Sequence, residues 1–184
     1  QPKEAADTTH LSALDRNGLA VALTHTNGAQ SGVITPGLGF MYNGQLSTYD
    51  PRRGRTQSLA PNKRRVSSMT PTIVFKGDKP HLVIGAPGGS NIPMAITQVI
   101  VNVIDHGMTI GDAISAQRIS ATSDVIDVGA RIPTYTCEAL GQLGYKTARS
   151  TQSFTVARVH GIMIDGDKVS GAADPAGGGM ALEV

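Results

Sequence analysis

Residues 9–26 read Thr-His-Leu-Ser-Ala-Leu-Asp-Arg-Asn-Gly-Leu-Ala-Val-Ala-Leu-Thr-His-Thr. Residues 9–15 alternate polar and apolar side chains, a pattern typical of a strand with one buried face. The Asp-Arg-Asn-Gly run at residues 15–18 favours a tight turn, and residues 19–26 return as a second strand. This stretch therefore predicts an antiparallel hairpin that begins directly after Thr8.

The segments that follow the hairpin mix strands and helices. We expect a loop at residues 27–39, strands at residues 40–42, 72–76, 81–86, 153–159 and 161–164, and helices at residues 92–106, near 110–117 and at 133–143. The helix at residues 92–106 is the clearest, because Ile92, Ile96 and Val99 recur at helical spacing. This balance, without an internal repeat, predicts a layered α/β or α+β domain.

The composition suits one compact domain or one subunit of a larger fold. Of the 184 residues, 40% are hydrophobic but only 16% are charged, against about 25% in typical soluble domains. With 22 glycines as well, the chain has little polar material to cover a free surface, which indicates that a partner chain covers part of it. The formal net charge of +2 selects no class of partner.

Three features bear on compartment and membranes. The single cysteine, Cys137, excludes an internal disulfide and is compatible with any compartment. The longest apolar stretch, residues 92–104, is interrupted by Gln98 and Asn102 and is too short to span a bilayer. Residues 1–4 lack the apolar region of a secretory signal. We therefore expect no signal in this stretch and leave the compartment open.

The common signatures of enzyme chemistry are missing from the sequence. There is no G-x-S-x-G elbow, no phosphate-binding loop and no zinc-type spacing of cysteine and histidine. The five histidines, at positions 10, 25, 81, 106 and 160, form no ligand pair at helical spacing. We therefore expect these histidines to be structural.

Two motifs remain as candidates for chemistry. Asp7 and Thr8 stand directly before a strand, and Gly88-Gly89 stands between a strand and a helix. A threonine hydroxyl is a poor nucleophile without a base, and an N-terminal threonine can use its own α-amine. A Gly-Gly pair leaves backbone N–H groups open to an oxyanion, with a helix N-terminus behind them. Taken singly, each motif fits plain strand or turn structure equally well.

Six segments, taken together, carry a resemblance to a known family. They are DTTHLS at 7–12, LTHT at 23–26, PNKRRVSSMTPT at 61–72, APGGS at 86–90, STQS at 150–153 and GAADP at 171–175. In this order they resemble the small subunit of the γ-glutamyltransferase (γ-glutamyltranspeptidase) family over nearly the whole chain. The P-N-K-R-x-x-S-S-M segment is specific, and its occurrence together with P-G-G-S argues against chance.

The resemblance implies an α+β fold, an αββα four-layer sandwich of the N-terminal-nucleophile hydrolase type, built from two chains cut from one precursor. Residues 1–7 would be the linker before the cleavage site, and residues 8–184 the small-subunit catalytic domain. The implied partner is a large subunit from the same precursor, in a heterodimer or a dimer of heterodimers. The substrate would be a small-molecule amide. No metal or organic cofactor, no nucleic acid and no membrane span in this chain are implied.

The resemblance also assigns a reaction to Thr8. Its hydroxyl would attack the carbonyl of Asp7, and an N-to-O acyl shift followed by ester hydrolysis would expose the Thr8 amine. In turnover, Thr8 Oγ would attack the γ-amide of a γ-glutamyl compound such as glutathione, and water or an amine would resolve the acyl-enzyme. Seven residues precede Thr8, so its nitrogen is an amide in the uncut chain, which we expect to be inactive.

Other site residues follow from the same resemblance. Thr26 matches the threonine that hydrogen-bonds the nucleophile, and Gly88 and Gly89 match the oxyanion hole. Ser67 and Ser68 match the pair that holds the α-carboxylate of the substrate. Thr26 could instead be a plain strand residue, and the two serines could simply turn the chain before the next strand.

The sequence departs from the family around the site for the substrate's amino group. Gln45 fits the family's glutamine, but Thr48 stands where an aspartate is expected, and Asp50 lies two residues further on. Asn27 matches the family's loop asparagine only if a gap is shifted. A missing carboxylate would weaken binding of a γ-glutamyl ammonium by about 1.5–3 kcal/mol. Cephalosporin-acylase-like and small-amide hydrolases of the superfamily differ in this same region.

Six basic residues lie between positions 52 and 65. A nucleic-acid stripe would interleave aromatic residues, and only Tyr49 is near. We expect a loop that the partner subunit structures. Three hypotheses for the function remain: a hydrolase or transferase of γ-glutamyl amides, the same chemistry on an acyl group without an α-amine, and an uncleaved relative that is not an enzyme.

Overall fold

The first hairpin forms as the sequence predicts. In the computed structural model, which describes residues 8–153 and 156–184, β1 (Thr8–Leu14) pairs antiparallel with β2 (Ala20–Thr26), and Thr8 stands opposite Thr26. Asp15 closes the turn, because its Oδ1 accepts the amides of Leu19 and Asn17, each at 2.8 Å. These donors, Leu19 first, lower the pKa of the Asp15 carboxyl.

A four-stranded antiparallel sheet forms the centre of the fold. Its strand order is β11 (Lys168–Ala173), β10 (His160–Asp165), β6 (Lys79–Gly85) and β5 (Thr72–Lys76). The middle of β6 is fully buried at Leu82, Val83 and Ile84. A continuous apolar run of this kind is typical of a strand that is covered on both faces.

Two helices cover one face of this sheet. η2 (Gly89–Asn91) leads directly into α1 (Ile92–Ile104), and α2 (Ile110–Ser115) follows after a short turn. Residues on one side of α1 pack with β6 and α2 into a single aliphatic core, which is made of Leu82, Ile84, Ala86, Ile92, Ala95, Ile96, Val99, Val103, Ile110, Ala113, Ile114, Val156, Ala157 and Val159. The helical periodicity that predicted α1 therefore reflects its buried face.

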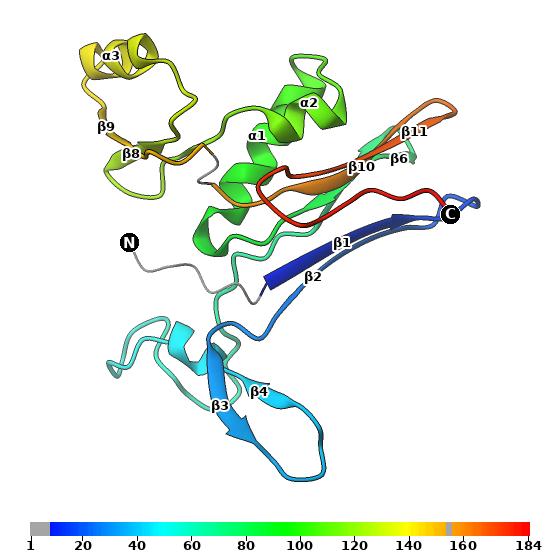
Figure 1. The fold of residues 1–184 in the computed structure, drawn as a ribbon. Coiled ribbons are helices and arrows are strands. Elements are labelled where there is room, and N and C mark those ends of the chain that lie inside the picture. Colours follow the sequence, from blue (N-terminus) through cyan, green and yellow to red (C-terminus); the bar gives the residue numbers. More distant parts are fainter. Residues whose placement is uncertain (1–7, 154–155) are drawn as a thin grey trace.

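The β1–β2 hairpin packs on the opposite face of the sheet (Figure 1). Its inner face presents His10 and Thr24, which are buried against β6 and β10, while Leu11, Val21 and Leu23 on the outer face are 57%, 41% and 49% exposed. His10 lies so close to Gly85 that a Cβ on this glycine would come within 2.2 Å of the imidazole Cε1. The described residues thus form three layers, helix–sheet–sheet, and the apolar outer face of the hairpin is open.

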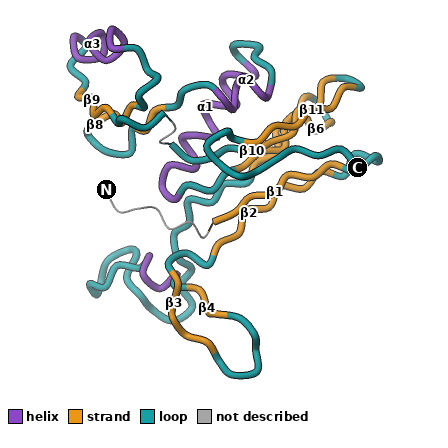
Figure 2. Tube along the Cα trace, viewed as in Figure 1, coloured by secondary structure: helices purple, strands orange, loops and turns teal. Residues whose placement is uncertain are grey.

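Two smaller units project from these layers (Figures 1 and 2). The first is β3 (Gln30–Ile34) with β4 (Met41–Asn43), followed by η1 (Gln45–Thr48) and the long loop that leads to β5. The second is a sheet of β7 (Ile119–Ser120), β8 (Val125–Val128) and β9 (Lys146–Arg149), with α3 (Thr134–Gln142) as the crossover between the parallel strands β8 and β9. Among the described residues, no helix is long and apolar enough to cross a bilayer.

The prediction of a strand at residues 153–159 was wrong. Residues 154–155 lie outside the described residues, and 156–159 belong to no strand. The carbonyls of Val156 and Ala157 accept hydrogen bonds from the guanidinium of Arg118, at 3.5 and 3.1 Å, instead of pairing with a neighbouring strand. Apolar alternation alone did not distinguish a strand from an extended segment held by a side chain.

The prediction of a loop throughout residues 27–39 was also wrong, because β3 lies within it. The pairing of β3 with β4 is irregular, and Gly32 has a φ of 73°. Ser31 Oγ also donates to the carbonyl of Tyr42 at 2.5 Å. A strand whose ladder is interrupted by a glycine and a side chain carries only a weak period-two signal.

The contact between Gly85 and His10 gives a test of the layer packing. Gly85→Ala should destabilise the protein by about 1–3 kcal/mol, because the added methyl group would overlap a buried ring. Thermal unfolding of the purified protein should show a lower midpoint. Gly141→Ala is the matched control: it adds the same methyl group in open space on α3, where alanine is favoured. An unchanged midpoint for Gly85→Ala would contradict the close approach of the two sheets.

Candidate active site

The hydroxyls of Thr8 and Thr26 meet across the first hairpin. Thr8 Oγ1 donates to Thr26 Oγ1 at 2.9 Å, and Thr26 Oγ1 also accepts the amide of Gly28 at 2.8 Å. The first contact follows from the register, which pairs residues 8 and 26 at the open end of the hairpin, and the second is local to the chain just after β2. Thr8 is half-buried, so its hydroxyl is oriented and still reachable. This arrangement can hold a threonine nucleophile in one rotamer.

Gln45 lies against Gly28, two residues after Thr26. Gly28, which has a φ of 62°, leaves so little room that a Cβ there would be 2.3 Å from Gln45 Nε2. The backbone of the same loop is tied to the residue after β4 by a bond from the Gly44 amide to the carbonyl of Asn27, at 2.9 Å. The structure therefore brings Gln45 against Gly28, whose amide donates to Thr26, while the Asn27 side chain is exposed.

Gly88 and Gly89 form the bend between β6 and α1. Their φ angles are 145° and 58°, both in the region that favours glycine. Gly88 also touches Ala157, since a Cβ at Gly88 would lie 2.3 Å from the Ala157 Cβ. Within residues 8–153 and 156–184, neither glycine amide donates a hydrogen bond. Two open amides ahead of a helix N-terminus can stabilise a negative oxygen.

Ser68 joins the glycine bend, whereas Ser67 does not. Ser68 Oγ donates to the carbonyl of Gly89 at 2.6 Å, which ties the segment before β5 to the bend. Ser67 Oγ accepts the Met69 amide at 3.2 Å and is exposed. Ser68 thus lies at the candidate oxyanion site, whereas the Ser67 side chain bonds only to the backbone two residues further on.

Asp50 is held by a neighbouring arginine. Its carboxylate accepts the amide and Nε of Arg52, both at 2.9 Å, and Nη2 at 2.7 Å. These contacts, the side chain first, lower the pKa of Asp50. In the structure, the Asp50 carboxylate is therefore paired with Arg52 and is not free to bind the ammonium group of a substrate. Asp7, the other side of the expected cleavage site, lies outside the described residues.

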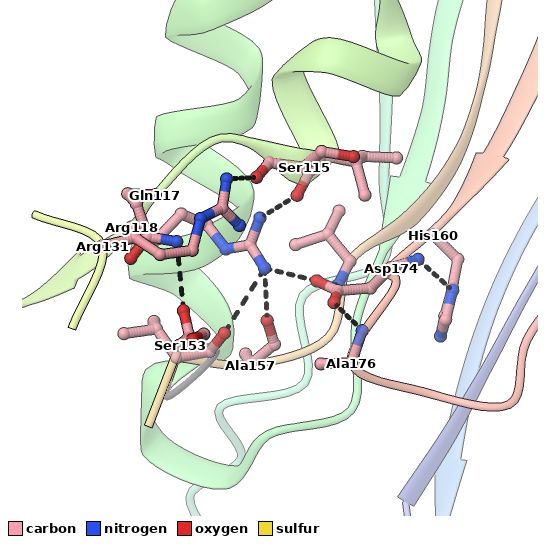
Figure 3. Close-up of polar contacts among 12 residues, drawn as sticks. Ser115, Gln117, Arg118, Arg131, Ser153, Ala157, His160, Asp174 and Ala176 are labelled. Carbon is pink, nitrogen blue, oxygen red and sulfur yellow. Dashed lines mark hydrogen bonds and ion pairs between the residues drawn. The ribbon is translucent and has the colours of Figure 1, made fainter. Parts of the chain in front are cut away.

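A buried ion pair that the sequence analysis missed lies behind the glycine bend. Arg118 and Asp174 have side chains that are 3% and 0% exposed and are joined through Nη2 and Oδ2. Asp174 also accepts the amides of Val159 and Ala176, at 3.2 and 2.9 Å (Figure 3). Asp174 belongs to the GAADP segment, so this segment was recognised, but nothing in the local pattern around Arg118 marks it as a buried partner.

Two histidines lie between the sheets beneath the site. His10 Nδ1 is 2.7 Å from Thr24 Oγ1 and Nε2 is 2.9 Å from Ser12 Oγ, while His160 Nδ1 accepts the Asp174 amide at 3.4 Å. Burial, and then the charge of His160, lower the pKa of His10 to about 4. Burial also lowers the pKa of His160, against the opposing effect of the Asp174 charge. Both rings lie in the interior and bond to neighbouring polar groups, and their purely structural role stays a prediction.

Among the described residues, no group of three or more His, Cys, Asp or Glu side chains is placed to hold a metal ion.

Comparison with known proteins places these features in a family. A family model described as Gamma-glutamyltranspeptidase matches residues 1–184. The chain belongs to the γ-glutamyltranspeptidase family. This confirms the resemblance drawn from the segments around Thr8, Ser68 and Gly88. The α+β class and the N-terminal-nucleophile hydrolase type of fold are confirmed as well, because a solved γ-glutamyltranspeptidase from Pseudomonas nitroreducens matches 96% of this chain and 99% of its own chain, with a TM-score of 0.84 and 30% identity.

Curated members of the γ-glutamyltranspeptidase family and its relatives point to two kinds of activity. The chain is 37% identical over 149 residues to an acylase ACY 1 proenzyme from Pseudomonas sp. (strain V22), which covers 80% of this chain and 27% of that protein. It is 34% identical over 193 residues to a glutathione hydrolase proenzyme from Bacillus subtilis (strain 168), covering 100% of this chain and 32% of that protein. The chain thus spans about a third of the length of these relatives.

The buried histidines predict a loss of stability in mild acid. The unfolded chain takes up a proton on His10 near pH 6.5, but the folded chain does so only near pH 4. The contribution of the neutral ring is therefore complete above pH 6.5 and is lost as the pH falls toward 4. We expect the free energy of unfolding, measured in urea, to be lower at pH 5 than at pH 7 by about 2 kcal/mol.

The variant His10→Gln separates this effect from other titrations. Glutamine keeps hydrogen-bonding atoms near Thr24 and Ser12 but takes up no proton in this range. The difference between pH 7 and pH 5 should shrink in this variant, even if its stability at pH 7 is lower. An equally steep difference in the variant and the parent would exclude His10 as the cause.

Proposed function

We propose that this chain is the catalytic part of an N-terminal-threonine amidohydrolase or acyltransferase that cleaves γ-glutamyl or related amides. The observation that carries the proposal is the contact of 2.9 Å between the hydroxyls of Thr8 and Thr26, in a chain of the γ-glutamyltranspeptidase family. A hydrogen-bonded hydroxyl at the start of a strand is the geometry that such a nucleophile needs.

Maturation comes first in the proposed sequence of events. The Thr8 hydroxyl attacks the carbonyl of Asp7, the acyl group moves from nitrogen to oxygen, and water hydrolyses the ester. Residues 1–7 are then the linker that leaves with the other chain, and residues 8–184 are the catalytic domain. The step matters because an amide nitrogen is no base, whereas an α-amine has a pKa of about 7.7–8.0 and is partly neutral near pH 7.

Turnover uses the same hydroxyl. The free amine of Thr8 takes the proton of Oγ as this oxygen attacks the amide carbonyl of the substrate, and the Thr26 hydroxyl keeps Oγ in place. The amides of Gly88 and Gly89 stabilise the oxyanion. The proton then passes to the leaving amine, and an ester on Thr8 remains. Water hydrolyses this acyl-enzyme, or an amine acceptor takes the acyl group. No step needs a metal or an organic cofactor.

Substrate binding is assigned to the loops around the threonine pair. Ser68, with Ser67 beside it, is assigned to the substrate carboxylate, and Gln45 to the polar end of the acyl group next to Gly28. Asn27 lies on the same loop.

A large subunit from the same precursor is the proposed partner. The curated relatives are proenzymes about three times longer than this chain, while one solved relative has a chain that this one matches over 99% of its length. The open apolar face of β1–β2 supports the same conclusion, because the four-layer sandwich requires another layer there. We therefore propose a heterodimer, with a dimer of heterodimers as a further possibility of assembly.

The direct test removes the Thr8 hydroxyl from the full-length protein. Thr8→Ala should release p-nitroaniline from γ-glutamyl-p-nitroanilide on the order of 1,000-fold more slowly than the parent, because the nucleophile is gone. Thr8→Ser is the matched control, since it keeps a hydroxyl opposite Thr26 and should retain part of the rate. A Thr8→Ala protein that keeps the rate of the parent would refute the mechanism.

Mass spectrometry of the same preparations tests the non-enzymatic alternative. The parent should yield a chain that begins at Thr8, and Thr8→Ala should remain joined to Asp7. A parent protein that is never cut at this bond would favour an uncleaved binding or scaffold protein.

A second candidate substrate class has an acyl group without an α-amine. Two observations favour it: the Asp50 carboxylate is already held by Arg52, and an acylase proenzyme is among the relatives. A substrate ammonium would have to displace the guanidinium from Asp50 before it could pair with this carboxylate. A glutaryl group makes no such demand.

A panel of p-nitroanilides separates the two classes. If Arg52 masks Asp50, glutaryl-p-nitroanilide should be hydrolysed with a higher kcat/KM than the γ-glutamyl compound. Arg52→Ala should then shift the ratio toward the γ-glutamyl substrate by roughly 10-fold to 100-fold, the range of one charge-assisted hydrogen bond. Arg53→Ala is the control, because Arg53 makes no bond to Asp50 in the described structure. A ratio that Arg52→Ala leaves unchanged would exclude the masking.

A further inference from the structure

We propose that the buried Arg118–Asp174 pair positions the Gly88 and Gly89 amides for the oxyanion, and that it acts through Ala157. The inference rests on the proposed function, in which these amides receive the negative oxygen. Neither Arg118 nor Asp174 touches the substrate in this account. They are positioning residues, and the path from the pair to the bend consists of three contacts.

The first contact joins the pair to the segment at residues 156–159. Arg118 Nη2 donates to the carbonyls of Val156 and Ala157, at 3.5 and 3.1 Å, while Asp174 accepts the Val159 amide at 3.2 Å (Figure 3). The segment belongs to no strand, so these bonds replace a sheet ladder. The two charged side chains therefore determine where this backbone lies.

The second and third contacts join this segment to the glycine bend. The Arg158 amide donates to the carbonyl of Pro87 at 3.0 Å. One residue before it, the Cα and Cβ of Ala157 stand where a Gly88 Cβ would be, at 2.5 and 2.3 Å. A hydrogen bond on one side and a steric contact on the other fix the peptides around Gly88. Any shift of Ala157 is thus passed to the bend.

The properties of the ion pair favour a positioning role over one in stability alone. Burying two charges costs free energy that their attraction only partly offsets, so a buried pair is weak evidence for stabilisation. Arg118 Nε is buried and, within the described residues, has no hydrogen-bond partner. The guanidinium is oriented so that its Nη atoms reach Ile114, Ala157 and Asp174, which is what holding an irregular segment in place requires.

The role matters because an oxyanion hole tolerates little displacement. Its donors stabilise the transition state when they lie about 2.7–3.1 Å from the oxygen, and loss of one donor costs on the order of 100-fold in kcat. Substrate binding in the ground state depends less on the same distance. A displaced bend should therefore lower kcat and leave KM nearly unchanged.

The test compares Arg118→Lys with Arg149→Lys in the processed, full-length protein. Lysine keeps the charge opposite Asp174 but cannot span the carbonyls of both Ile114 and Ala157. Arg118→Lys should lower kcat about 10-fold to 100-fold while KM changes less than about threefold. Arg149, whose guanidinium donates to the carbonyls of Ala130, at 3.1 Å, and Ile132 in the unit that contains β8 and β9, is the control and should leave both constants unchanged. Equal kcat in Arg118→Lys and the parent would overturn the proposal.

Ala157→Gly tests the path if Arg118→Lys fails to fold. It removes the methyl group that faces Gly88 and leaves the ion pair intact. It should lower kcat in the same way by itself. Where Arg118→Lys does fold, the losses of kcat in the two single variants should not multiply in the double variant, because both act through one contact. A full-rate Ala157→Gly enzyme, or losses that multiply, would refute transmission through Ala157.

Crystal structures of the parent and Arg118→Lys proteins test the positioning role without an activity measurement. They should show Ala157 displaced and the Gly88–Gly89 peptide rotated in the variant. An unmoved bend would refute positioning even in an active enzyme. If the bend moves but the parent hydrolyses no amide, the proposed function fails while the structural coupling stands.

Discussion

The close contact between Gly85 and the ring of His10 is the constraint on which the site depends. It allows the β1–β2 hairpin to pack closely on β6, because the ring of His10 fits into the space that a side chain at position 85 would fill. The strand that begins with Thr8 and the strand that ends just before Gly88 are therefore packed against each other. Because both elements are rigid β-structure, the proposed nucleophile and the candidate oxyanion donors are carried by one scaffold.

The interior that holds this scaffold together is partly polar. His10, Thr24, Ser120, Arg118 and Asp174 are buried among aliphatic side chains. Each of them has a hydrogen-bond partner, as burial of a polar group requires. Aliphatic residues pack with little directional preference, whereas these groups accept only a few geometries. The apolar core thus supplies most of the driving force for folding, and the polar contacts select the arrangement of the loops around Thr8 and Gly88.

Much of the scaffold could be predicted from the sequence, and the reason is local. The hairpin of β1 and β2 and the helix α1 each bury one face of a regular element, so their periodicity is visible in the chain. The contact between Thr8 and Thr26, expected from the family resemblance, also follows from the register of that hairpin. Residues 156–159 and Arg118 could not be predicted, because their structure is set by partners about 40 residues away in the sequence, such as Ala157, 39 residues from Arg118. The sequence identified Asp50 as a candidate carboxylate, but it did not indicate that Arg52 would bind this carboxylate.

The open face of the β1–β2 hairpin has a consequence for how such a protein must be made. The two-stranded sheet exposes Leu11, Val21 and Leu23 to water, and both of its strands are edge strands. Such a surface favours non-specific association with other chains. Synthesis as one polypeptide, as proposed above, would solve this problem, because a covering segment on the same chain would be present at millimolar effective concentration before any competing molecule arrives. In the proposed maturation, scission after folding would leave two pieces that are already assembled. Recombinant production of the small piece alone would forgo that advantage and should end in inclusion bodies.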